Sequence, residues 1–335
     1  MAKLSEARTF LNSFTSTDAR KFVQYIMKRN YAEAIVEHHP DPQSINEEVV
    51  IEKCQYLVTS AFQRIEQIQH SPEELFPLFA QLSRNKQPRD EIWFDEFLQA
   101  YQLYKHQRKL RRRYEKIKDY LQGESYCDIG CGGGDFVAFL KHHHKSFHQL
   151  AGIDVMDWRT EAVKDEIGFQ TLDLSQPNTF SEIKYDTMTC LAVLHHVGNT
   201  DEAQGFFLQN IRNSLAEGGR LIIEEDVMLP ENEIKNHPAY QHQLKKLKAQ
   251  QSILSDFLQF DYATQKDCII LIDFLANALA VGVPEMAFPC GFRSINEWTT
   301  LLENNGFAVE EVKIAGFVPG NFNQSSHVYF VLNKL

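Results

Sequence analysis

The stretch Tyr126-Cys-Asp-Ile-Gly-Cys-Gly-Gly-Gly-Asp-Phe136 decides the fold of this chain. A helical pattern ends just before it, at residues 119–121, and a new apolar helical pattern begins at Phe136. This order predicts a short strand, a tight glycine turn and the first turn of a helix. Glycines let a backbone approach a ligand closely, and a helix N-terminus offers it unpaired N–H groups. Asp128 adds a carboxylate that can bind a cationic amine.

Two classes of nucleotide cofactor are bound by such a turn. The dinucleotide fingerprint G-x-G-x-x-G, started at Gly130, requires a third glycine at position 135, where this chain has Asp135. The residues Asp128-x-Gly130-x-Gly132-x-Gly134 instead resemble the first motif, D-x-G-x-G-x-G, of class I S-adenosylmethionine-dependent methyltransferases. The resemblance implies S-adenosylmethionine as cofactor, bound at this turn by Asp128, Gly130, Cys131 and Gly132.

The composition of the 335 residues is that of a soluble globular protein, with 43% hydrophobic and 24% charged residues. No apolar run reaches the roughly 18 residues of a membrane span, and the N-terminus lacks an apolar secretory core. The six cysteines show no C-x-x-C spacing, so neither a disulfide framework nor a zinc site is predicted. We therefore expect a cytoplasmic protein. The net charge of −11 argues against broad nucleic-acid binding.

Residues 1–121 contain no glycine and show helical patterns throughout, which predicts an all-helical cap or interaction domain. Within it, residues 101–118 hold eight Lys and Arg against one acid. The basic helix 105–118 is either a docking surface for an acidic partner, such as a carrier protein or a nucleic-acid backbone, or the solvated face of a long helix. The second interpretation is preferred.

From residue 124 strands and helices alternate, which predicts a mostly parallel sheet covered by helices on both faces. The predicted fold of residues 122–335 is a Rossmann-like, doubly wound, seven-stranded α/β sheet that closes with an antiparallel hairpin. Strands are expected at 125–129, 148–153, 167–171, 185–192, 220–224, 308–315 and 326–332, with a helix at 201–215.

Ligands of open α/β sheets bind beyond the carboxyl ends of the strands, and several candidate residues fall there. By the family resemblance, Asp154 accepts hydrogen bonds from both ribose hydroxyls, with Asp157 as a lower-ranked alternative. Asp173 would bind the adenine amino group. Four apolar residues are expected beside the cofactor. Val155 and Met156 would flank the adenine, and Leu174 and Leu191 would also contact the cofactor.

Residues 227–290 form an insertion with helical patterns, which we expect to be a lid over the substrate. Its apolar lining is expected to include Phe288, Phe292 and Trp298. Residues 292–307 resemble the R-S-x-x-E-W…G-F passage of bacterial small-molecule methyltransferases, which implies a capped helix.

Two histidines end the fourth strand, next to where the transferred methyl group would lie. Methyl transfer is an in-line displacement, for which orientation alone can contribute about 7–11 kcal/mol. An oxygen or carbon nucleophile often also needs a base, and a group that titrates near neutrality suits that role. His196 better matches the family motif and is the first candidate; His195 is the second. The alternative is that one ring packs on the cofactor while the other faces solvent.

The acids Glu224-Glu225-Asp226 end the fifth strand and face the same region. They could orient a histidine, bind an amine substrate, or join a histidine and Asp273 around a divalent metal. No spacing defines such a site, so no metal is predicted.

The preferred function is methyl transfer to an oxygen or carbon of a small molecule, either free or attached to an acidic carrier protein. One alternative is an RNA or protein methyltransferase guided by the basic helix 105–118. Against it, the fourth strand lacks the N/D-P-P-Y/F tetrad typical of amino-group methylation. Another alternative is a non-catalytic scaffold, which need not keep Asp128, Gly130, Gly132 and Asp154 together.

Overall fold

The computed structural model describes residues 110–179, 182–230, 232–233, 241, 260–275, 290–317 and 326–335. The chain divides into two compact units. One contains His106–Val227, Cys290–Gly316 and Ser326–Leu335, and the other contains Met1–Lys105, Met228–Pro289 and Phe317–Ser325. Most of the predicted helical domain, residues 1–109, lies outside the described residues, so its fold and the domain bounds stay predictions.

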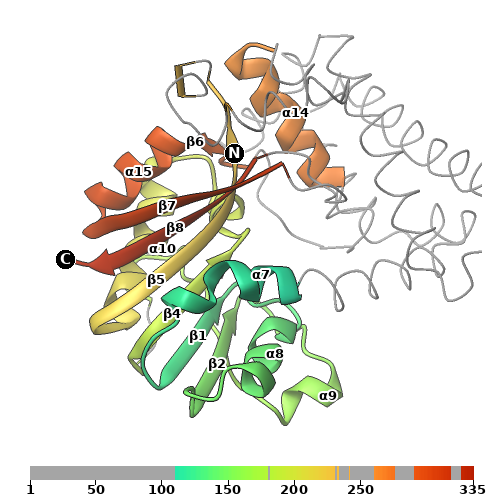
Figure 1. Ribbon diagram of the computed structural model, residues 1–335, viewed down its shortest axis with the longest axis vertical. Coiled ribbons are helices and arrows are strands. Elements are labelled where there is room, and N and C mark those ends of the chain that lie inside the picture. The colour runs from blue at the N-terminus through green and yellow to red at the C-terminus, as the bar shows by residue number, and fades with distance from the viewer. Residues whose placement is uncertain are drawn as a thin grey trace, which may run out of the picture. The chain divides into compact units, whose positions relative to one another are not determined.

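The first unit is built on a sheet with the strand order β3-β2-β1-β4-β5-β8-β7 (Figure 1). Strands β1 to β5 pair in parallel, and β8 pairs antiparallel with β5. This arrangement confirms the predicted Rossmann-like, mostly parallel sheet with an antiparallel end. The strands are β1 Ser125–Ile129, β2 Gln149–Asp154, β3 Gly168–Thr171, β4 Tyr185–Leu191, β5 Leu215–Met228, β7 Phe307–Phe317 and β8 Ser326–Lys334.

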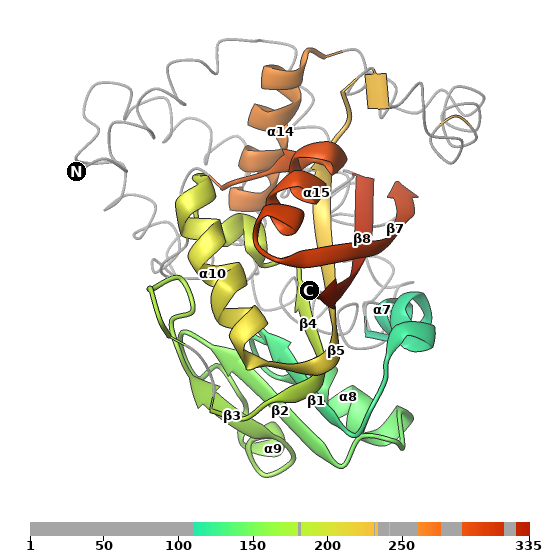
Figure 2. The same cartoon turned by 90° about the vertical axis from the view of Figure 1, so that its left-hand side faces the viewer.

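Helices cover both faces of this sheet, as Figures 1 and 2 show. Apolar residues of α7 Leu110–Ile117 and α8 Asp135–His143 pack with Tyr126, Ile222 and Tyr329 in one buried cluster. Helices α10 Asp201–Ser214 and α15 Ile295–Asn304 lie on the opposite side. Two faces covered by helices explain why β4 is buried along nearly its whole length.

Strand β5 is longer than predicted, because it begins at Leu215 and continues to Met228. Tyr185 pairs with Leu215 but Thr187 pairs with Arg220, so the residues between them bulge out of the ladder. Gly218 adopts a φ of +70° in this bulge. A short strand that the sequence did not predict, β6 Arg293–Ser294, also pairs with β5.

The capped helix predicted after residue 292 is confirmed as α15. The Ser294 hydroxyl accepts a hydrogen bond from the Glu297 N–H at 3.3 Å, and the Glu297 carboxylate accepts one from the Ser294 N–H at 2.8 Å. This reciprocal pair is a capping box. Trp298 and Phe292 are fully buried, and their expected place in the lid lining stays a prediction. Phe288 lies outside the described residues.

The other unit is described at Tyr262–Leu275, which form helix α14, and at a few neighbouring residues. This helix lies within residues 227–290, where the sequence shows helical patterns. Across the described part of the chain, none of the helices combines the length and the apolar character that crossing a membrane requires.

The glycine turn after β1 requires its first glycine for two separate reasons. Gly130 has a φ of +65°, and a Cβ atom there would lie 2.5 Å from Val193 Cγ2. Gly218 has a similar φ, but a Cβ there would meet no atom within 4 Å. A side chain at either position would strain the backbone, but only at position 130 would it also overlap a neighbouring side chain.

We predict that Gly130→Ala destabilises the protein more than Gly218→Ala does. Both variants bear the left-handed backbone cost of roughly 1–2 kcal/mol, whereas only Gly130→Ala adds an overlap that costs about 1–3 kcal/mol. Urea unfolding of the two variants and the parent measures the difference. Equal losses of stability in the two variants would contradict the predicted contact with Val193.

Candidate cofactor and catalytic site

Asp128 is a buried carboxylate at the carboxyl end of β1, with 4% of its surface exposed. Its Oδ1 atom accepts a hydrogen bond from the Thr189 hydroxyl on β4 at 2.6 Å, and the Tyr126 hydroxyl contacts the same Thr189 oxygen. Burial raises the pKa of Asp128 to about 7, against the lowering by the Thr189 hydrogen bond and the Arg113 charge. Burial therefore disfavours the ionised form of this side chain, and a cationic ligand beside it would stabilise that form.

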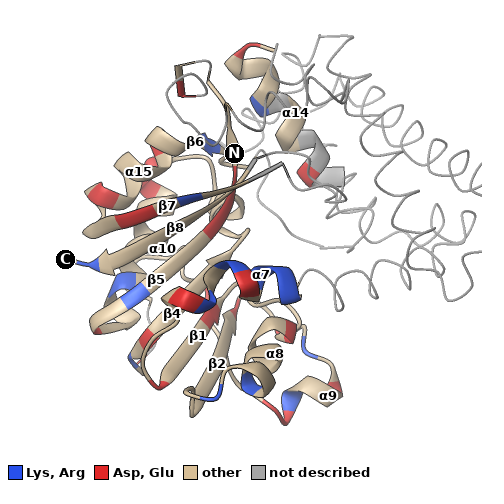
Figure 3. Cartoon of the chain, viewed as in Figure 1, with Lys and Arg blue, Asp and Glu red and all other residues tan. Residues whose placement is uncertain are grey.

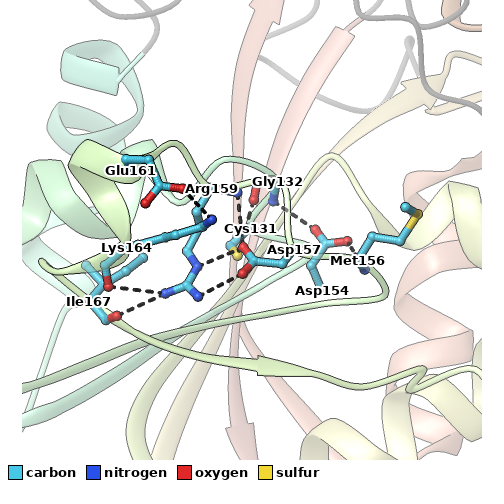
Figure 4. A network of polar contacts seen from close by, with 9 residues as sticks. All are labelled: Cys131, Gly132, Asp154, Met156, Asp157, Arg159, Glu161, Lys164 and Ile167. Carbon is cyan, nitrogen blue, oxygen red and sulfur yellow. Dashed lines mark hydrogen bonds and ion pairs between the residues drawn. The ribbon is translucent and has the colours of Figure 1, made fainter.

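Asp154 ends β2 and lies directly against the glycine turn, as Figure 4 shows. Its Oδ2 atom accepts a hydrogen bond from the Gly132 N–H at 2.8 Å. The Gly130 N–H in turn donates to the Ile153 carbonyl at 2.7 Å. The predicted cofactor residues of the first two strands are thus brought together, and Cys131 lies between them with its side chain partly buried.

The loop after β2 turns Val155 and Met156 outward, where both side chains are exposed. Arg159 holds this loop (Figure 4): its Nε and Nη2 atoms lie 2.9 Å from the two oxygens of Asp157. The hydrogen bond from Arg159 lowers the pKa of Asp157 to about 2. Asp157 is therefore already engaged, which makes Asp154 the better ribose candidate.

Asp173 follows β3 and forms a local turn. Its Oδ1 atom accepts hydrogen bonds from the Ser175 N–H at 3.0 Å and from the Ser175 hydroxyl at 2.5 Å. Leu174 is buried, and its carbonyl accepts a hydrogen bond from the Asn210 side chain at 2.8 Å. Contact of Asp173 and Leu174 with the adenine stays a prediction, because these bonds also suit a simple turn.

The two histidines lie on a short 3-10 turn, Leu194–Val197, just after β4. His195 is 1% exposed, and its Nδ1 atom lies 2.6 Å from Glu225 Oε2 on β5. The other oxygen of Glu225 accepts a hydrogen bond from the Leu194 N–H at 2.8 Å. Burial raises the pKa of Glu225, and the His195 ring opposes that shift. In the tautomer in which Nδ1–H donates to this carboxylate, Nε2 is the ring atom that can take up a proton.

His196 has a different neighbour from His195. Its Nδ1 atom lies 3.6 Å from Cys290 Sγ, and its ring centroid lies 4.0 Å from that of His195. The His195 ring also stacks on Phe292 with centroids 4.3 Å apart. The resemblance to the family motif ranked His196 first, whereas the Glu225 carboxylate and the Phe292 ring contact His195.

Gln204 of α10 fixes the histidine turn against the segment before α15, and the sequence gave no sign of this role. Its amide nitrogen donates to the Gly198 carbonyl at 2.9 Å and the Gly291 carbonyl at 3.2 Å. Its oxygen accepts a hydrogen bond from Arg293 Nε at 2.8 Å. The Gly291 N–H completes the link by donating to the His195 carbonyl at 2.7 Å.

The acids beside Glu225 point to the opposite face of β5, as the two-residue period of a strand requires. Glu224 Oε2 lies 2.6 Å from Arg113 Nε of α7, and Asp226 Oδ1 lies 2.8 Å from His327 Nδ1 of β8. Arg113 also donates to the carbonyl of Leu191, the predicted cofactor residue at the end of β4, at 3.3 Å. Sequence reasoning assigned a site role to neither Arg113 nor His327.

The raised pKa of Asp128 predicts a stability change of known sign. An unfolded Asp ionises near pH 4, whereas folded Asp128 ionises at about 7. Ionisation therefore destabilises the folded protein increasingly between those values, by up to about 4 kcal/mol above pH 7. We predict that Asp128→Asn stabilises the cofactor-free protein at pH 8 and that this gain disappears near pH 4.

The matched control is Asp186→Asn on β4, where the sign is reversed. Although burial raises it, the pKa of Asp186 is lowered overall by hydrogen bonds from the Glu124 and Ser125 N–H groups and the Ser125 hydroxyl. Asp186→Asn should therefore lose stability at pH 8. Urea unfolding at pH 4, 6 and 8 measures the stability of both variants. A similar loss of stability in both variants at pH 8 would contradict the raised pKa of Asp128.

The chain matches the family described as "Methyltransferase domain" over residues 100–312, which is more than half of its length. No curated protein matches it. Among solved structures it is similar to magnesium protoporphyrin IX methyltransferase from Synechocystis PCC 6803 with bound SAH, at 17% identity over 69% of this chain and 84% of that chain, with a TM-score of 0.39.

Two further solved structures are similar at the same low level. The pyocyanin biosynthetic protein PhzM is 16% identical over 86% of this chain and 72% of that chain, with a TM-score of 0.48. N-methyltransferase NodS from Bradyrhizobium japonicum WM9 is 12% identical over 77% of this chain and 97% of that chain, with a TM-score of 0.42. Such likeness concerns the fold alone. The family match covers both the glycine motif and the parallel strands, and the chain therefore belongs to the class I S-adenosylmethionine-dependent methyltransferases.

Proposed function

We propose that this enzyme transfers the methyl group of S-adenosylmethionine to an oxygen or carbon atom of a small molecule, with a histidine of the turn Leu194–Val197 as base. The observation that carries the proposal is the buried His195–Glu225 pair, 2.6 Å apart, just beyond the carboxyl end of β4. A base is useful to an acidic oxygen or carbon acceptor, because its proton must leave as the new bond forms.

The residues of the first three strand ends fit the cofactor. Asp128 is a buried carboxylate with a raised pKa, which suits the cofactor's ammonium group. Asp154 is ready to accept from the ribose hydroxyls, with exposed Val155 and Met156 beside the adenine and Asp173 at its amino group. When bound, S-adenosylmethionine supplies an electrophilic methyl group on a sulfonium.

Glu225 fixes the His195 ring so that Nε2 can take the acceptor proton, and Gln204 and Phe292 hold the same turn from the other side. Preorganised groups of this kind lower the cost of orientation in the transition state. His196, next to Cys290, is the alternative base. The pair can be separated by experiment because only His195 contacts Glu225 among the contacts described above.

A small-molecule acceptor is supported by the net charge of −11 and by the resemblance of residues 292–307 to bacterial small-molecule methyltransferases. The basic helix gives little support to a nucleic-acid guide in its described part, where Arg113 pairs with Glu224 and Lys118 pairs with Glu115. Presentation of the acceptor by a carrier protein, and a substrate lid formed by residues 227–290, remain parts of this proposal.

We predict that Asp154→Ala weakens binding of S-adenosylhomocysteine by about 10- to 100-fold, the worth of hydrogen bonds to a charged group. Asp157→Ala, the matched control, should leave the affinity within about threefold, since Arg159 already holds that carboxylate. Isothermal titration calorimetry measures both variants. A larger loss of affinity in Asp157→Ala than in Asp154→Ala would make Asp157 the ribose-binding residue.

We predict that His195→Ala lowers the rate of S-adenosylhomocysteine formation by about 10²–10⁴-fold. Its affinity for S-adenosylhomocysteine should hardly change. Glu225→Gln should show a smaller loss in the same direction, and His196→Ala a smaller one still. The assay uses purified enzyme, S-adenosylmethionine and a panel of phenols, enols and carboxylic acids.

The variants distinguish three outcomes. A severe loss confined to His196→Ala would make His196 the base. Full activity in both histidine variants would remove base catalysis from the account. Absence of any calorimetric signal for S-adenosylhomocysteine in the parent would contradict the cofactor placement itself.

A further inference from the structure

A chain of three buried polar side chains joins β1 to β4, and the function proposed above uses only one end of it. The Thr189 hydroxyl donates to Asp128 Oδ1 at 2.6 Å, and the Tyr126 hydroxyl contacts the same Thr189 oxygen. Each of these side chains belongs to a residue that is at most 4% exposed. Buried polar groups are costly unless they are hydrogen-bonded, so each member of the chain depends on its neighbour.

The pairing of β1 with β4 brings these residues together. In the parallel ladder Asp128 lies beside Thr189, and Tyr126 lies beside Thr187. Because side chains alternate along a strand, all four point to the same face of the sheet. Tyr126 packs there in the buried cluster that includes residues of α7 and α8. Thr189 is therefore the residue that the sheet itself places next to the carboxylate.

The hydrogen bonds of the chain run in one direction. A hydroxyl carries a single proton, so when Thr189 donates to Asp128 it can only accept from Tyr126. Burial raises the pKa of the Tyr126 hydroxyl and of the neighbouring Cys127 and Cys131 thiols, so all three stay neutral. Tyr126 therefore keeps the proton that it donates. Hydrogen bonds in such a chain polarise one another, which strengthens the last bond toward a negative acceptor.

Charged groups from three neighbouring elements also act on Asp128. Figure 3 shows the basic helix α7 next to an acidic stretch of β5. Burial is the largest influence on the pKa of Asp128 and raises it, whereas the Thr189 hydrogen bond is the largest influence that lowers it. Arg113 of α7 lowers this pKa further, and Asp154 of β2 and Glu224 of β5 raise it. The ionised form of Asp128 thus depends on Thr189 more than on the nearby cation.

We propose that Thr189 is a positioning residue for cofactor binding, which holds Asp128 as a carboxylate ready for the cofactor's ammonium group, and that Tyr126 fixes the Thr189 hydroxyl for this task. The geometry of the chain supports both parts, because the donor order ends at Asp128 Oδ1. This inference rests on the cofactor placement proposed above.

The consequence is that Thr189 sets how cofactor affinity depends on pH. A hydrogen bond to the ionised form lowers the pKa of a carboxyl group, so removing the Thr189 hydroxyl should raise the pKa of Asp128 above about 7. Binding below that pKa must also release the Asp128 proton, which weakens the affinity about tenfold for each pH unit by which the pKa rises. At a pH above the pKa of both proteins, their affinities should converge.

The test is calorimetric titration of the full chain with S-adenosylhomocysteine at pH 6 and pH 9. Thr189→Val keeps the shape of the side chain without its hydroxyl. At pH 6 it should bind the ligand about 10- to 100-fold more weakly than the parent, the worth of a hydrogen bond to a charged group. At pH 9 the two affinities should lie within about threefold of each other. Thr189→Ser keeps the hydroxyl and should recover the parent affinity at pH 6.

Thr187→Val is the matched control, because it is the same change two residues earlier on β4. The Thr187 hydroxyl donates to the Gln122 carbonyl at 2.7 Å and accepts from the Gln122 N–H at 3.0 Å. This variant loses hydrogen bonds that do not involve Asp128, so it should keep the parent affinity at both pH values.

A second variant alters the chain without breaking the bond to the carboxylate. Tyr126→Phe keeps the buried ring and leaves the Thr189 hydroxyl beside Asp128. Because only the polarisation of the last hydrogen bond is lost, binding at pH 6 should weaken by a smaller factor, about two- to fivefold.

The outcomes separate this inference from the proposed function. A loss of affinity in Thr189→Val that is equal at pH 6 and pH 9 would indicate a purely structural role and overturn the inference, as would an unchanged affinity at both. If Thr189→Val does not fold, Tyr126→Phe decides, and parent affinity in that variant at pH 6 would overturn the inference. Failure of the parent to bind S-adenosylhomocysteine would instead contradict the cofactor placement.

Discussion

The burial of one carboxylate at the end of β1 is the constraint on which the site depends. A strand covered on both faces should be apolar, yet Asp128 lies among Tyr126, Thr189 and the sheet core with a pKa raised to about 7. Such a group destabilises the empty fold and is stabilised by a cation. We propose that the cofactor's ammonium group binds beside the glycine turn at this carboxylate.

The side chains of the three consecutive acids at the end of β5 point alternately to the two faces of the sheet. Glu224 faces Arg113 on the α7 side, whereas Glu225 faces His195 on the α10 side. Because side chains alternate along a strand, a slip of one residue would exchange these partners. The bulge between Leu215 and Arg220 sets this register against β4. The pairing of β4 with β5 therefore positions both Glu224, beside Arg113, and Glu225, beside the proposed base His195.

The sequence was informative where local patterns decide the structure. The glycine turn, the acids at the strand ends and the capping box at Ser294 each follow from a few neighbouring residues, and their positions agree with the structure. Arg113, Gln204 and His327 escaped prediction because their partners lie on distant strands and loops, so no spacing reveals them. Which of His195 and His196 is the better base candidate depends on the geometry of a 3-10 turn. The burial of Trp298 depends on its packing under Arg293.

The most direct test of the account is the number of protons exchanged when S-adenosylhomocysteine binds. Calorimetry at several pH values, in buffers of different ionisation enthalpy, measures that number. Because the ligand's ammonium should require ionised Asp128, binding is predicted to release close to one proton below pH 7 and almost none above pH 8. The release should be absent in Asp128→Asn. Binding with no proton release at pH 6, and with equal affinity in Asp128→Asn, would contradict the central role of this carboxylate.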